Sequence, residues 1–140
     1  MKINEFIKQS DKNSIISTML KHYDVGTVRV MHKNIKNHAH YDVDRGQLQL
    51  STKYKTLKAN QIKPFLITIL HEIRHAMDAK KYGWKKFKEM YEMEQNMIAQ
   101  GWYKDKHDPY KDNKYEIEAE EFGQKTWKIW YDKFKRSGLL

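Results

Sequence analysis

The chain has 140 residues, no cysteine, and 27 lysines and arginines against 18 aspartates and glutamates, a formal net charge of +9. The length fits one domain, which we expect to span residues 1–140, and the 13% of aromatic residues argues against disorder. The absence of cysteine excludes disulfides and thiolate metal sites, so any metal ion must be bound by histidine, carboxylate or carbonyl groups.

The first half of the chain predicts one helix and a small sheet. Residues 14–23 carry apolar side chains at helical spacing, and residues 27–32 alternate apolar and polar side chains as a strand does. Residues 40–51 predict a hairpin with its turn at Arg45 and Gly46. In its second arm, residues 47–51, leucine alternates with glutamine, which predicts one buried face.

The second half predicts three helices, so the whole chain is expected to have an α+β fold. Residues 64–82 form a long helix that begins near a proline and is apolar around most of its circumference, as a buried central helix is. Residues 84–100 predict a more charged helix, and residues 101–114 an irregular connection. Residues 115–135 predict the last helix, which has one apolar stripe.

Two histidines lie four residues apart in the predicted helix 64–82, within the segment His71-Glu72-Ile73-Arg74-His75. This spacing places both imidazoles on one helix face, one turn apart, where they can bind one zinc ion. Glu72 can accept a proton from a water that the metal activates. Chance predicts only about 0.02 such motifs in a chain of this composition, and the apolar surroundings disfavour a surface helix with incidental histidines.

Catalytic zinc sites usually have three protein ligands and an open position, so a third ligand is needed. The metzincin class continues with a glycine and a third histidine after His75, and this chain has Asp78 and Lys81 at those places. That class is therefore excluded. The remaining candidates are His107 and the carboxylates of residues 116–121.

Helix geometry separates the glutamates of this segment. At 100° per residue, Glu116 lies beside the apolar stripe of the last helix, and Glu120 lies one turn further along the same side. Glu118 and Glu121 turn the other way, toward solvent. Gly123 is on the side of Glu116, where the missing side chain permits close helix packing. We therefore expect Glu116 to be the third metal ligand and Glu120 to hydrogen-bond a ligating histidine.

The chain resembles the zincin metallopeptidases of the gluzincin type, and is most similar to their minimal bacterial and phage versions, related to those that cleave phage repressors. The likeness is carried by His71-Glu72-Ile73-Arg74-His75-Ala76 and by Tyr115-Glu116-Ile117-Glu118-Ala119-Glu120-Glu121-Phe122-Gly123. It aligns Glu116 with the third metal ligand and Glu120 with the usual Asp or Asn, and Gly123 replaces the common alanine. The implied fold combines an N-terminal helix, a small antiparallel sheet, an active-site helix and a C-terminal glutamate helix.

The resemblance implies a zinc-dependent peptidase that acts on a protein or peptide substrate, with Zn²⁺ as its cofactor. Glu72 is then the general base, and Tyr110, Tyr115 and His107 are candidate donors to the oxyanion. The hairpin arm 47–51 is a candidate edge strand that pairs with an extended peptide. Residues 1–10 contain no continuous apolar region of a signal peptide, and the apolar stretch 65–70 is too short for a bilayer. We therefore expect a cytoplasmic enzyme (in the host cytoplasm if a phage encodes it) with no membrane partner.

Two other functions fit parts of the sequence. The net charge of +9 is compatible with a DNA-associated module on a zincin scaffold, although a lysine-rich solvated surface is the simpler interpretation. An interaction protein that keeps zinc only for folding is the third hypothesis. A second metal site formed by His32, His38 and His40 around the hairpin is conceivable, but surface histidines are the simpler interpretation.

Overall fold

The computed structural model describes residues 6–26, 28–42 and 44–140, which form an α+β fold. Within these residues the elements follow the chain as α1 (Gln9–His22), β1 (Arg29–Lys33), β2 (Ala39–Asp42), β3 (Gln47–Ser51), α2 (Ile62–Tyr82), α3 (Trp84–Ala99) and α4 (Lys114–Arg136). Two short 3-10 helices, Thr52–Tyr54 and Ala59–Gln61, lead from the sheet into α2. The predicted strand residue 27 lies outside the described residues.

The sheet is mixed, so the expectation of a purely antiparallel sheet was wrong. Strands β2 and β3 form the predicted antiparallel hairpin, but β1 pairs with β3 in parallel, in the order β1-β3-β2. After β1 the chain crosses the end of β3 through residues 34–38 and enters β2 at the far edge. The consecutive strands β1 and β2 therefore do not pair, whereas the prediction assumed that each strand lies beside its neighbour in sequence.

Strand β3 is central and buried along its whole length, which corrects two further predictions. Gln47 and Gln49 are 8% and 6% exposed, so the arm has no solvated face. The Gln49 side-chain amide donates to Gln47 Oε1 over 3.3 Å, which satisfies part of their polar groups. Because both edges of β3 are paired, it cannot bind an extended peptide.

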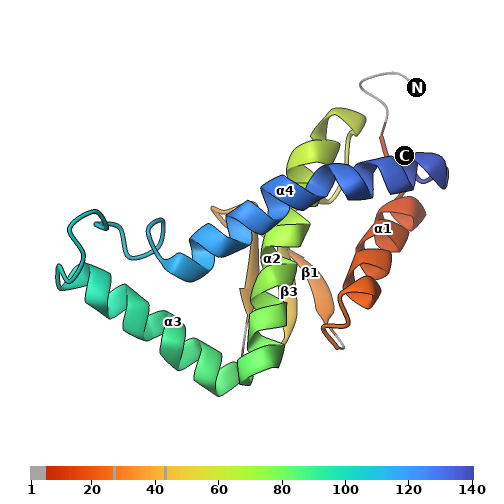
Figure 1. Cartoon of the computed structure of the whole chain (residues 1–140). Helices are drawn as coiled ribbons and strands as arrows, with labels where there is room; N and C mark the ends of the chain where they lie inside the picture. The colour runs from red at the N-terminus through yellow and green to blue at the C-terminus, as the bar shows by residue number, and fades with distance from the viewer. Residues whose placement is uncertain (1–5, 27, 43) are drawn as a thin grey trace.

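Helix α2 is the centre of the fold. In Figure 1 it lies between the sheet and α4, with α1 packed to one side and α3 extending from its C-terminal end. Its buried residues join those of α1, β3 and α4 in one hydrophobic core. Gly83, with a φ of 82°, ends α2 and starts the turn into α3. Among the described residues, no helix has both the length and the apolar character needed to cross a membrane.

Helices α2 and α4 approach each other closely at Gly123, as predicted. A Cβ atom at this position would lie 2.8 Å from the backbone oxygen of Ile67 and 3.2 Å from its Cγ2. No other residue type leaves room for this approach without a backbone shift. The contact holds the N-terminal half of α4, which carries Glu116 and Glu120, against the face of α2 that carries His71.

Helix α1 begins at Gln9, five residues before the expected start, because its first turns are polar and lack the apolar pattern that predicted the helix. One residue of these turns is a buried lysine. Lys12 is 1% exposed. Its ammonium group donates to the carbonyl oxygens of Tyr54 and Lys55, at 2.8 and 3.2 Å, and lies 2.8 Å from His32 Nε2. These three partners allow the ammonium group to be buried. The polar residues around Lys12 in the sequence instead suggest an exposed helix end.

Candidate metal centre

Two histidines of α2 and one glutamate of α4 converge on a single point. The Nε2 atoms of His71 and His75 each lie 2.8 Å from the same atom, Oε1 of Glu116. The histidines are one turn apart on α2, and their rings meet edge to face with centroids 5.0 Å apart. The fold therefore brings Glu116 next to two predicted ligands, His75 and His71, which lie 41 and 45 residues before it in the sequence.

The fold keeps these three side chains in place by burying them. His75 is 7% exposed and Glu116 is 8% exposed, and the His71 side chain is 14% exposed. Glu116 lies in the first turn of α4, where the Asn113 side chain accepts a hydrogen bond from the backbone N–H of Tyr115 and caps the helix. The positive end of the helix dipole favours a carboxylate at this position.

Further hydrogen bonds orient two of the ligand candidates. Nδ1 of His71 lies 2.9 Å from Oε2 of Glu120, as the sequence predicted. The Tyr91 hydroxyl, from α3, donates to Oε2 of Glu116. Nδ1 of His75 is buried and has no hydrogen-bond partner among the described residues. The carboxylate of Glu120 can therefore fix the tautomer of His71, so that Nε2 faces Glu116.

Hydrogen bonds and neighbouring charges outweigh burial in setting the protonation of this cluster. Burial lowers the pKa of His71, but its hydrogen bonds to Glu116 and Glu120 and the charge of Glu72 outweigh it and raise the pKa to about 9. Burial raises the pKa of Glu116, but hydrogen bonds from His71, His75 and Tyr91 outweigh it and hold the pKa well below its ordinary value. Without metal, His71 is therefore an imidazolium and Glu116 a carboxylate at neutral pH.

Glu72 lies beside the two histidines without a bonded partner. It is 6% exposed, its Oε1 is 4.0 Å from His71 Nε2, and it forms no hydrogen bond within the described residues. Burial raises its pKa, although the charges of His75 and His71 work against this. A buried carboxylate with a raised pKa, at the edge of a cavity, suits a general base.

The residues present fit a zinc ion. Two imidazole nitrogens and one carboxylate oxygen form a donor set that zinc uses in hydrolases. Among the described residues, His71, Glu72 and His75 also offer ligand atoms within 4.8 Å of one another. Around a tetrahedral zinc ion, ligand atoms are about 3.3 Å apart, so Glu116 Oε1 would have to move away from each nitrogen by only about 0.5 Å.

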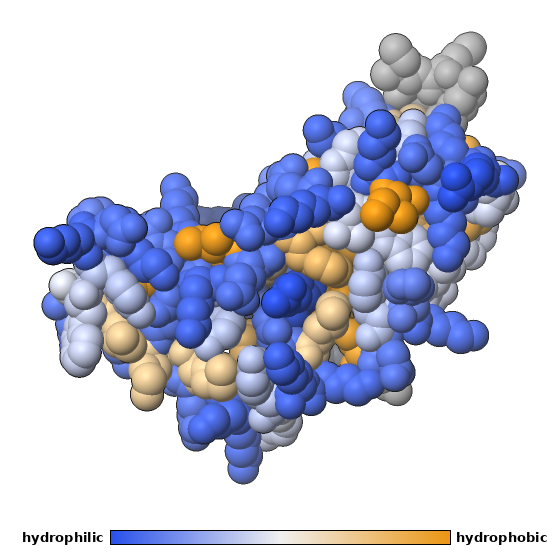
Figure 2. All heavy atoms as spheres, viewed as in Figure 1, coloured by the Kyte–Doolittle hydropathy of each residue, from blue (hydrophilic) through white to orange (hydrophobic). Residues whose placement is uncertain are grey.

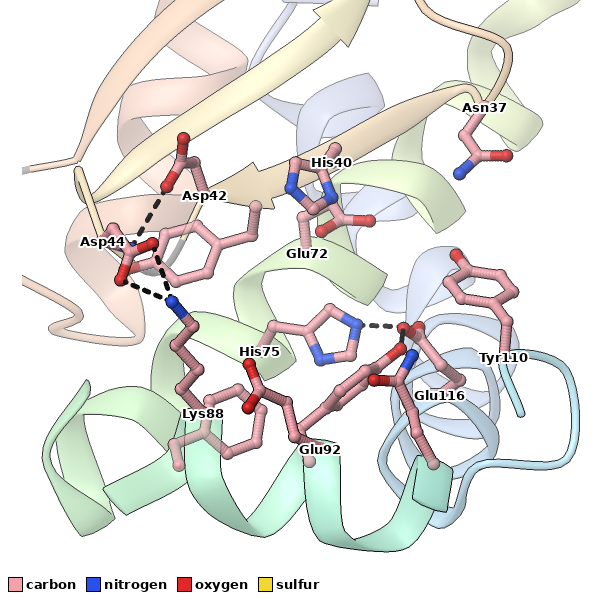
Figure 3. A pocket seen from close by; sticks show the side chains of 14 residues that line it. Asn37, His40, Asp42, Asp44, Glu72, His75, Lys88, Glu92, Tyr110 and Glu116 are labelled. Atoms are coloured by element: carbon pink, nitrogen blue, oxygen red, sulfur yellow. Dashed lines mark hydrogen bonds and ion pairs between the residues drawn. The ribbon is translucent and has the colours of Figure 1, made fainter. Parts of the chain in front are cut away.

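The three predicted oxyanion donors have different surroundings. Tyr110 lies on the connection between α3 and α4 and lines two cavities that Glu72 also lines, one of which is drawn in Figure 3. Tyr115 is 6% exposed and packs on Phe87 and Tyr91 in a small apolar cluster, so it lines none of these cavities. His107 is exposed and lines none either. Of the three, Tyr110 alone reaches the site.

Sequence reasoning missed two residues of the site. Tyr91 was assigned no role, because its position within the charged helix α3 gives no sign that it faces Glu116. His40 is exposed, as expected of a surface histidine, but its place on β2 over Glu72, where it lines the same cavity, was not predicted (Figure 3). The knowledge that β2 is the edge strand beside α2 would have singled it out.

The other histidines of the hairpin do not converge. His32 contacts Lys12, and His38 lies 2.6 Å from the Tyr54 hydroxyl and 3.2 Å from Lys53 Nζ. These separate partners do not support a second metal site within the part of the chain that the structure describes.

Compared with protein-family models, curated proteins and solved structures, the chain gives no match. The function proposed below therefore depends on the residues and geometry of the site.

Proposed function

We propose that the protein is a zinc-dependent metallopeptidase of the minimal zincin type, acting on a protein or peptide substrate in the cytoplasm. The observation that carries the proposal is the convergence of His71, His75 and Glu116 beside the buried carboxylate of Glu72, which forms no hydrogen bond among the described residues. A helix with both histidines, crossed by a helix with the glutamate, is the arrangement expected for that type. The sheet, with its parallel pair, departs from the antiparallel arrangement we expected.

The chemistry divides between the metal and the chain. A bound zinc ion would lower the pKa of a water molecule and polarise the carbonyl of the scissile bond. Glu72 accepts the proton of the attacking water and delivers it to the leaving amine. Tyr110, from the opposite side of the cavity, donates a hydrogen bond to the negative charge that develops on the carbonyl oxygen. Glu120 keeps the His71 ring oriented.

Metal content is the decisive measurement. Protein purified without a metal-affinity tag should contain about one zinc per chain, as a single three-ligand site requires, measured by mass spectrometry. Glu116→Ala should lose most of it, whereas Glu118→Ala, at an exposed position of the same helix, should keep it. Wild-type protein that binds no zinc, even after incubation with it, would overturn the proposal and favour a binding module.

Activity needs a separate variant. Glu72→Gln should keep the zinc and lose peptide hydrolysis by a factor of at least about 100, since it removes the general base. Cleavage of an unstructured protein such as casein, followed by mass spectrometry of the fragments, provides the assay. Unchanged hydrolysis in a zinc-loaded Glu72→Gln protein would refute the assigned role.

A further inference from the structure

A cavity of about 460 Å³ opens beside Glu72, between β2, α2 and α3 (Figure 3). Strand β2 forms its upper wall in this view, and α3 forms its floor. Glu72, His75 and Glu116 lie at its inner end. A peptide bound at the candidate metal centre would therefore place a neighbouring side chain in this cavity.

The rim of the cavity is negative in a protein of strongly positive net charge. Asp42 at the end of β2, Asp44 from the turn that follows, and Glu92 from α3 all line it. Lys88 is the one lysine or arginine among the lining residues. The chain as a whole carries a formal charge of +9, so the local excess of carboxylates runs against the composition.

Aromatic rings line the cavity below this rim. Tyr41 from β2 and Phe87 and Tyr91 from α3 contribute to the wall. Aromatic faces attract the aliphatic stem of a long side chain and also its cationic head. An apolar wall under a rim of carboxylates therefore suits lysine or arginine better than an apolar or acidic side chain.

The Lys88 side chain already shows which chemistry the rim accepts. Its ammonium group reaches from α3 to the Asp44 carboxylate, with Nζ 3.2 Å from Oδ2. Both side chains are about half exposed, at 47% and 51%. An exposed ion pair of this kind contributes little to stability, so a substrate cation can compete for Asp44.

Two independent observations support a ligand in this cavity. One concerns Glu72, and the other shows that the excess of carboxylates is confined to one side of Glu72. Glu72 lines it, is 6% exposed, and has no hydrogen-bond partner among the described residues, as expected for a carboxylate that acts on a bound molecule. A second cavity, of about 390 Å³, lies on the other side of Glu72 and is lined by Lys36, His38 and Gln124. Apart from Glu72, its one carboxylate is Glu120, which is engaged by His71.

We propose that the cavity between β2 and α3 holds the side chain of a lysine or arginine, so that the enzyme cleaves peptides beside a basic residue. Asp44 and Glu92 bind the cationic group, and the aromatic wall packs on its stem. Asp42, whose carboxylate accepts hydrogen bonds from the backbone N–H groups of Asp44 and Arg45, adds its charge to the rim. This inference rests on the proposed peptidase function, and its test separates the two.

The test compares peptides that differ at one position. Quenched fluorescent peptides carry lysine, arginine, norleucine or glutamate at the residue on either side of one scissile bond. On one of the two sides, kcat/KM should be about three- to tenfold higher for lysine than for norleucine, and lowest for glutamate. The preference for lysine over norleucine should shrink in 0.5 M NaCl, because the Debye length is then only about 4 Å and the rim charges are screened. Equal rates for lysine, norleucine and glutamate on both sides would overturn the inference.

Three variants assign the preference to this cavity. Glu92→Gln should lower the ratio of lysine to norleucine about threefold, because it removes one rim charge. Lys88→Met should raise it, since it frees Asp44 while keeping an apolar stem. Glu89→Gln, on the same helix but outside the cavity lining, should leave the ratio unchanged. If neither Glu92→Gln nor Lys88→Met alters the preference for lysine, the basic side chain of the substrate binds outside this cavity.

Binding is measured separately from hydrolysis. The zinc-loaded Glu72→Gln protein is titrated against the same peptides, labelled at one end, by fluorescence anisotropy. Tighter binding of the lysine peptide, reversed by adding Glu92→Lys, supports the pocket even if no peptide is hydrolysed by the wild type. Hydrolysis that depends on Glu72 but ignores charge leaves the peptidase standing and refutes the pocket.

Discussion

Tyr91 donates its hydroxyl hydrogen to Oε2 of Glu116, while Oε1 of the same carboxylate faces the two histidines. This bond ties α3 to the candidate ligand on α4. Tyr91→Phe should weaken zinc binding by about 10–100-fold, because it frees the carboxylate to rotate. Competition with a fluorescent zinc chelator measures the change. Tyr82→Phe is the control, since Tyr82 is exposed at the C-terminal end of α2 and forms no hydrogen bond with Glu116. An equal loss of zinc affinity in both variants would contradict the assignment.

Zinc binding should release a proton from His71. In the metal-free protein its pKa is raised to about 9, so at pH 7 the ring is protonated and must lose a proton to bind metal. Calorimetry at pH 7 in two buffers of different ionisation enthalpy measures the protons released per zinc ion bound. His71 should contribute about one proton, whereas a histidine of ordinary pKa would contribute only about a quarter of a proton. Zinc affinity should rise about tenfold per pH unit up to pH 9. A pH-independent affinity between 7 and 9 would contradict this.

The metal-free protein should be most stable in mildly acidic solution. The pKa of His71 is raised from 6.5 to about 9, so its contribution is complete below pH 6.5 and is lost as the pH rises through about 9. The pKa of Glu116 is lowered from 4.5, so its contribution is complete above pH 4.5 and is lost as the pH falls further. Thermal unfolding with a chelator present should give the highest Tm between these limits. His71→Gln should flatten the decline on the alkaline side.

Sequence reasoning located the candidate centre because its ligands obey helix periodicity. The spacing of His71 and His75 and the side of the last helix that carries Glu116 are local properties, and both follow from 100° per residue. The close approach at Gly123 follows from the same periodicity. These predictions needed no knowledge of which elements pack together.

The features that sequence reasoning missed depend on long-range packing. The parallel pairing of β1 with β3 results from a five-residue crossing that carries no distinctive pattern. The role of Tyr91 depends on how side chains of α3 meet the first turn of α4, and the burial of Tyr115 depends on the same contact. Hydrophilic side chains cover most of the visible surface in Figure 2, so hydropathy alone distinguishes no interface on that face. The negative cavity rim emerges only once β2 and α3 face each other.

Gly123→Ala should separate the two helices that hold the metal ligands. Alanine in a helix is ordinarily more stable than glycine by about 1 kcal/mol. Here its Cβ would meet the Ile67 backbone oxygen at 2.8 Å, so the clash should win and the net loss should be about 1–3 kcal/mol in urea unfolding. Zinc affinity should fall with it. Lys128→Ala, at an exposed position of the same helix, should change neither. A stabilised Gly123→Ala protein would show that the helices do not pack this closely.

Glu94 should control activity through the loop that carries Tyr110. It is 3% exposed and accepts hydrogen bonds from the Tyr103 hydroxyl at 2.7 Å, Lys106 Nζ at 2.9 Å and the Lys114 backbone N–H at 3.0 Å. Glu94→Gln removes the charge that holds Lys106, at a cost of about 1–3 kcal/mol to the local structure. Amide hydrogen exchange should then accelerate in residues 101–113 while zinc content stays constant.

The same variant separates a positioning role from a role in binding metal. If Tyr110 stabilises the developing oxyanion, loosening its loop should lower kcat more than it changes KM, and Tyr110→Phe should lower kcat in the same way. Combining the two substitutions should then cost little more than Tyr110→Phe alone, because both act through one hydroxyl group. Glu89→Gln, on the same helix as Glu94 but exposed, is the matched control. Fully additive losses would mean that Glu94 acts on the reaction by a route other than Tyr110.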